Sequence, residues 1–77
     1  MNLYLIYQDV NSGYDTYDSA VVIADDASAA RQMLPADRTE EWRKYIWCDP
    51  KFVHVEYLGK AKAGSILSCV CSSFNAE

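Results

Sequence analysis

The sequence predicts an α+β fold: a small four-stranded, mostly antiparallel sheet, in the order β-β-α-β-β, with one helix packed on one face. Four segments are rich in the apolar, aromatic and β-branched residues typical of strands, and one segment between the second and third repeats apolar residues at helical spacing. Hairpins predominate over long crossovers, which favours antiparallel pairing. The length of 77 residues predicts a single domain, residues 1–77.

The first half of the chain is expected to hold a hairpin. Residues 2–10 alternate as a strand, residues 11–18 contain the turn formers Asn11, Ser12 and Gly13 and are expected to be a loop, and residues 19–24 form the second strand.

Residues 25–34 carry apolar residues at helical spacing. Asp25 or Asp26 is expected to cap the amino end of this helix, and Pro35 is expected to end it.

The segment 36–50 is harder to assign. Asp37 and Glu40 have the spacing of a capping box, which predicts a short second helix over 38–46, and a turn is expected at 48–51.

The second half is expected to supply two more strands, at residues 51–58 and 65–74. Alternation divides the strand residues between two faces. The face expected against the helix holds Leu3, Leu5, Val21, Ile23, Val53, Val55, Leu67 and Cys69. The opposite face is also apolar, which predicts either a second small core closed by Trp42 and Trp47 or a contact surface, with a homodimer formed through Tyr4, Ile6, Val22, Phe52, Ile66 and Val70.

The charge distribution argues against nucleic-acid binding. The formal net charge is −4, and the first 37 residues hold six acids and a single base, whereas nucleic-acid binders carry a basic footprint. The amino end lacks the basic and apolar regions of a signal peptide, and no apolar run is long enough to span a bilayer. We therefore expect a cytoplasmic protein with no membrane partner.

No motif in the sequence announces a catalytic activity, so we expect no enzyme, no cofactor and no metal. Cys48, Cys69, Cys71 and His54 have the stoichiometry of a zinc site, but not its spacing. Nucleotide-binding and nucleophile-elbow glycine motifs are absent from the sequence.

Two segments have the composition of a protein contact. The stretch "GYDTYDSAVV", residues 13–22, combines rigid aromatic and acidic side chains, although its aspartates could instead make local turn bonds. The segment 42–47 has the composition of a binding hot spot. The predicted partner-binding residues are Tyr14, Asp15, Tyr17, Asp18, Trp42, Arg43, Tyr45 and Trp47.

The stretch 1–31 together with "VHVEYLGKAKAG" (53–64) and "SSFNA" (72–76) resembles a group of small phage and prophage proteins of uncharacterised function. The resemblance covers most of the chain except residues 35–47, and this sequence also departs from the group at "SCVC". It implies a viral gene expressed in a bacterial cytoplasm and no particular activity.

By analogy of size and setting, we expect a non-catalytic antagonist of a bacterial defence system, similar to anti-CRISPR inhibitors, that binds a host protein or defence complex. The alternatives are a self-associating structural or regulatory dimer and a binder of a small nucleotide signal.

Overall fold

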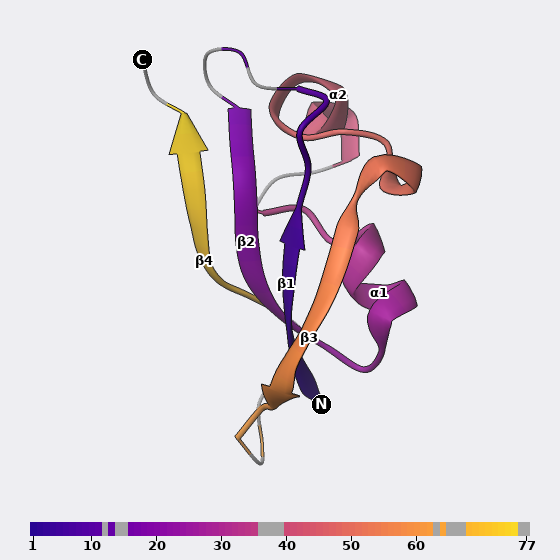
Figure 1. Cartoon of the computed structure of the whole chain (residues 1–77), viewed down its shortest axis with the longest axis vertical. Helices are drawn as coiled ribbons and strands as arrows, with labels where there is room; N and C mark the ends of the chain where they lie inside the picture. Colours follow the sequence, from indigo (N-terminus) through magenta and orange to yellow (C-terminus); the bar gives the residue numbers. More distant parts are fainter. Residues whose placement is uncertain (12, 14–15, 36–39, 63, 65–67, 76–77) are drawn as a thin grey trace.

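The computed structural model of the chain describes residues 1–11, 13, 16–35, 40–62, 64 and 68–75. Four strands form one sheet: β1 (Asn2–Tyr7), β2 (Thr16–Ala24), β3 (His54–Lys60) and β4 (Ser68–Asn75). The strand order is β3-β1-β2-β4, and every neighbouring pair is antiparallel (Figure 1). The predicted fold class is confirmed.

Two short helices and two 3₁₀ turns accompany the sheet. Helix α1 (Ala27–Gln32) packs against β1, β2 and β3, whereas α2 (Arg43–Ile46) follows the 3₁₀ turn η1 (Glu40–Trp42) and contacts β2. The second 3₁₀ turn, η2 (Pro50–Phe52), leads into β3. The helix predicted between the second and third strands is therefore present, and so is a short second helix.

Capping explains several element boundaries. The Asp26 carboxylate accepts the Ala29 N–H at 2.8 Å, so α1 begins after Asp26 and is shorter than the predicted 25–34. Its last turn ends at Met33, whose backbone is already extended. Asp49 caps η2 by accepting the Lys51 N–H at 3.1 Å, and for this reason β3 begins at His54 and not at residue 51.

One more element begins at a residue other than the predicted one, and two predictions fall on residues that the structure does not describe. Strand β2 begins at Thr16, which places Tyr17 and Asp18 in the strand and not in the predicted loop. The predicted capping box needs Asp37, which lies outside the described residues, as do residues 65–67 of the predicted last strand.

The assignment of faces in the first hairpin was wrong. The core between the sheet and the helices is built from the alternate set of residues on β1 and β2, namely Tyr4, Ile6, Ala20, Val22 and Ala24, together with Ala30, Ile46, Trp47, Cys48 and Val53. Ala30 of α1 is fully buried, and the small side chains of Ala20 and Ala24 leave room on the sheet for a helix to approach closely. Larger residues at these positions would hold the helix away.

The predicted homodimer surface is therefore wrong as well. Tyr4, Ile6 and Val22 lie in the core and cannot meet a second copy. Phe52 and Val70 are exposed but lie on a 3₁₀ turn and on β4, and Ile66 lies outside the described residues. The uncovered sheet face carries the other set, with Leu3, Leu5, Val21 and Ile23 half-buried.

Two bulges explain why simple alternation fails on the outer strands. Leu3 pairs with Gly59 and Tyr4 with Tyr57, so Leu58 is an extra residue in β3. Val21 pairs with Cys71 and Val22 with Cys69, so Val70 is an extra residue in β4. Each bulge reverses the face to which the following residues belong.

Candidate functional site

The chain that leaves β1 and the predicted contact segment 42–47 lie at the same end of the sheet. The side-chain amide of Asn11 donates to the carbonyl of Trp47 at 2.8 Å and to that of Tyr45 at 3.3 Å. In Figure 1 the chain that leaves β1, residues 8–11, lies beside α2 at the top of the molecule. We call this region, residues 8–11 with residues 40–48, the loop end.

Gln8 fixes the conformation of the chain that leaves β1. Its side chain is buried, and its Oε1 accepts the N–H groups of Val10 at 2.9 Å and Asn11 at 2.8 Å. Its Nε2 donates to the carbonyls of Asn11 and Tyr17, both at 2.8 Å. One buried amide thus satisfies four backbone groups that would otherwise need water.

Neither Gln8 nor Asn11 was predicted as a site residue. The available signal was a lone amide side chain at the end of an apolar strand, followed three residues later by a second amide. Such side chains bond readily to nearby backbone groups and organise loops.

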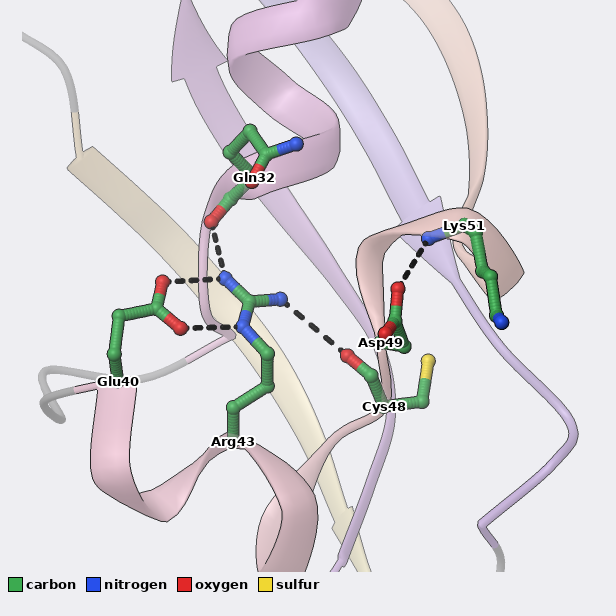
Figure 2. Close-up of polar contacts among 6 residues, drawn as sticks. All are labelled: Gln32, Glu40, Arg43, Cys48, Asp49 and Lys51. Carbon is green, nitrogen blue, oxygen red and sulfur yellow. Dashed lines mark hydrogen bonds and ion pairs between the residues drawn. The ribbon is translucent and has the colours of Figure 1, made fainter.

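Arg43, predicted as a partner-binding residue, is buried and holds α2 against the end of α1. Its guanidinium pairs with Glu40 through two bonds, Nε to Oε2 at 2.6 Å and Nη2 to Oε1 at 2.7 Å, and Nη2 also donates to the Gln32 carbonyl at 2.5 Å (Figure 2). Nη1 donates to the Cys48 carbonyl at 3.4 Å. Arg43 is buried, so these partners satisfy a charge that has little access to water.

The Arg43–Glu40 pair shifts both ionisation equilibria. The hydrogen bond from Arg43 lowers the pKa of the Glu40 carboxyl, with a smaller contribution from the positive charge itself. The same hydrogen bond raises the pKa of Arg43 further above its already high value. The ion pair is therefore fully formed at neutral pH.

Cys48 is a buried thiol beneath this network. Burial raises its pKa above the ordinary value, and the negative charges of Asp49 and Asp9 act in the same direction, whereas the positive charge of Arg43 opposes them. The protonated thiol is a poor nucleophile. Cys48 is thus a packing residue at this end of the molecule.

The two tryptophans have opposite environments. Trp47 is fully buried in the core, which corrects its prediction as a partner-binding residue. Its indole Nε1 has no hydrogen-bond partner among the described residues. Trp42, in contrast, is 44% exposed and forms an edge-to-face pair with Tyr45, which is 59% exposed, with ring centroids 6.2 Å apart.

The exposed pair lies beside a charged rim. The ammonium of Lys44 sits 5.1 Å from the centre of the Tyr45 ring. A shallow hollow is lined by Glu41, Trp42, Lys44 and Tyr45, and a neighbouring one by Glu40, Glu41, Arg43, Lys44 and Asp49. Both are open surface features, suited to a side chain of another protein more than to an enclosed small molecule.

The predicted residues of the loop are only partly brought to this site. Tyr17 is half-buried and packs against the core from β2, and Asp18 is half-buried in the same strand, where its carbonyl accepts the Gln8 N–H at 3.1 Å. Tyr14 and Asp15 lie outside the described residues. Of the eight predicted contact residues, Trp42 and Tyr45 are the two that the described structure places on the surface as an aromatic pair.

Searches of the described residues and comparisons with known proteins add three findings. The described part of the chain contains no cluster of three metal-ligating side chains. None of the helices within the described ranges is long and apolar enough to cross a membrane. Comparisons with family models, curated proteins and solved structures find no match to this chain.

Proposed function

We propose that this protein acts without catalysis, by binding another protein through the loop end, with Trp42 and Tyr45 as the central contacts. The observation that supports this proposal is the exposed edge-to-face pair on a segment whose backbone is fixed by buried side chains. Trp and Tyr are enriched among the residues that dominate binding energy in protein interfaces.

The pair is held in place before any partner arrives. Arg43 ties the segment to the end of α1, and Asn11 ties the carbonyls of Tyr45 and Trp47 to the loop that Gln8 organises. A prearranged contact loses less conformational entropy on binding, so more of the contact energy appears as affinity.

The surroundings of the pair indicate the chemistry of the partner. Glu41 and Asp49 line the hollows, and Asp9 lies close enough to affect the Cys48 thiol. A complementary surface would offer an apolar pocket for the two rings and basic groups at its rim. Such a surface is common on complexes that themselves hold nucleic acid.

The biological setting of the proposal follows the resemblance to phage and prophage proteins. We infer that the protein works in a bacterial cytoplasm and that its partner is a host protein or defence complex, which it inhibits in the manner of an anti-CRISPR protein. The acidic amino-terminal half of the chain suits a partner that carries a basic surface.

The test is affinity capture from bacterial lysate with the tagged chain, followed by mass spectrometry and by direct titration of whatever is retained. The Tyr45→Ala variant is expected to weaken the titrated affinity about tenfold or more, the loss typical of a hot-spot residue. Tyr57→Ala is the matched control, because Tyr57 is exposed to nearly the same degree, 57%, but lies on β3, away from the loop end.

Two results would contradict the proposal. Equal loss of affinity in both tyrosine variants would mean that the loop end is not the contact. A chain that retains no defence complex, and that gives a sensitive phage no protection in plaque assays, would remove the inhibitor function.

A further inference from the structure

The two outer strands of the sheet differ in how well they are protected against pairing with another strand. An edge strand presents unpaired backbone groups, and natural proteins guard it with charged residues, prolines, bulges or a covering element. Strand β3, one edge, carries Glu56 and Lys60, contains the Leu58 bulge and has α1 packed against it. This edge is guarded.

Strand β4, the other edge, also has a bulge, and near its start the Cys69 thiol donates to the Pro35 carbonyl at 3.0 Å, but within the described residues it has no charged side chain and no helix packed against it. The sequence of Ser68–Asn75, "SCVCSSFN", contains no charged residue, no proline and no glycine. Among the described elements β4 packs only against β2, and in Figure 1 it lies apart from both helices at the left edge of the sheet. Its pairing with β2 is irregular at two places, the Val70 bulge and the extra residue Asp18 in β2, and residues 71–73 between them pair in regular register.

We propose that β4 is an interaction surface for a second copy of this chain, with the two β4 strands pairing antiparallel about a twofold axis to form an eight-stranded sheet. The proposal is independent of the partner contact at the loop end. It replaces the sheet-face dimer that the burial of Tyr4, Ile6 and Val22 excludes.

The lack of charged residues on β4 favours pairing with the β4 strand of a second copy of this chain. In an antiparallel pairing of a strand with itself, any charged residue near the axis would face the same charge, which destabilises the pair. Residues 70–75 have no charge to oppose, although the chain as a whole carries −4. The uncharged edge is thus the place where two like-charged molecules meet with the least repulsion.

The contrast between the edges also fixes the size of the assembly. A contact between two identical edges is closed, because each copy uses its uncharged edge strand, β4. Since β3 is guarded at both outer ends of the eight-stranded sheet, growth stops at two copies. An aggregate or a fibre is not expected.

The test is sedimentation equilibrium of the purified full-length chain over a series of concentrations. The mass is expected to rise from 8.7 kDa to twice that value and then stop. Added salt is expected to strengthen the association, because it screens the repulsion between two chains of net charge −4.

The decisive variant is Ser72→Lys, which places a charge on the exposed part of β4 and is expected to weaken dimerisation about fivefold or more. The matched control is Ser28→Lys, on an exposed position of α1, which is expected to leave dimerisation unchanged. Circular dichroism checks that both variants fold, and Val70→Lys, also exposed on β4, replaces the first variant if Ser72→Lys does not.

Four outcomes would overturn the proposal: a monomer at every concentration, association that Ser72→Lys leaves unchanged, growth beyond two chains, or protection of the β4 amides from hydrogen exchange only when a foreign protein is added. The last outcome would assign the edge to a strand of another protein.

Discussion

Replacing Arg43 by alanine tests whether the loop end is held by an ion pair or by bonds to backbone carbonyls. Arg43 contacts Glu40, the Gln32 carbonyl and the Cys48 carbonyl. The side chain of Arg43 is 10% exposed and that of Glu40 is 71% exposed, so the guanidinium is largely shielded from water while the carboxylate is open to it. The carboxylate can be replaced by water, whereas the carbonyls that close the two helices cannot easily find another donor.

The magnitude follows from these contacts. An exposed ion pair contributes roughly 0.5 kcal/mol. The bond to Gln32 contributes about 1.5 kcal/mol and the longer bond to Cys48 about 0.5 kcal/mol, as hydrogen bonds from a charged donor. Burial of the aliphatic part of Arg43 adds about 1 kcal/mol. We expect Arg43→Ala to lower the free energy of unfolding by about 3.5 kcal/mol and Glu40→Ala by less than about 1 kcal/mol.

The assay is urea unfolding followed by tryptophan fluorescence, since fully buried Trp47 reports on this end of the core. The double variant measures the coupling energy between the two side chains, expected at about 0.5 kcal/mol. Arg43→Lys should fall between the single variants, because lysine keeps the charge and most of the stem but cannot reach several acceptors at once. A Glu40→Ala variant as unstable as Arg43→Ala would refute the reasoning.

Four further predictions concern the same region. Trp47→Ala is expected to lower the free energy of unfolding in urea by about 3–5 kcal/mol and Trp42→Ala by under about 1 kcal/mol, because of the two tryptophans it is Trp47 that is buried in the core. Equal losses would contradict the described burial. Asn11→Ala should speed hydrogen exchange at residues 43–47 and cost about 1 kcal/mol by removing two bonds to their carbonyls, and unchanged exchange would contradict that coupling. The lowered pKa of Glu40 contributes stability that is present above its unfolded value near 4.5 and lost as pH falls through the folded value, so Glu40→Gln should flatten the acid limb of the stability curve. The raised pKa of Cys48 means that stability falls as pH rises above about 9.0, and Cys48→Ala should remove that alkaline loss.

Alternation located the strands of the sheet but did not decide which face is covered. Both faces of β1 and β2 are apolar, and the larger side chains of Val21 and Ile23 made their face the natural candidate for the core. The structure places Ala20, Val22 and Ala24 there instead. Close approach of a helix depends on small side chains, so total hydrophobicity was the wrong criterion.

The segment 40–48 shows a second limit. Trp42, Tyr45 and Ile46 have helical spacing, and so do Arg43, Ile46 and Trp47. The sequence analysis placed Arg43 and both tryptophans among the partner-binding residues, with the tryptophans as the alternative cover of a second core. The second set is the buried one, because Arg43 supplies donors to the Gln32 carbonyl at the end of α1 and to the Cys48 carbonyl just after α2. Such a need becomes visible only when both helix ends are placed side by side.

The two proposed contacts use different parts of the molecule and can operate together. The loop end lies at one end of the sheet beside α2, whereas β4 lies along one side (Figure 1). Antiparallel pairing of two β4 strands reverses the direction of one copy, so the two loop ends would point to opposite ends of the dimer. A single small partner molecule would then reach one loop end of the dimer and not both. A dimer would therefore bind two partner molecules, one at each loop end. Dimerisation should therefore leave the affinity per chain unchanged, and Ser72→Lys, which separates the copies, should alter the mass of the complex but not the strength of binding at Trp42 and Tyr45.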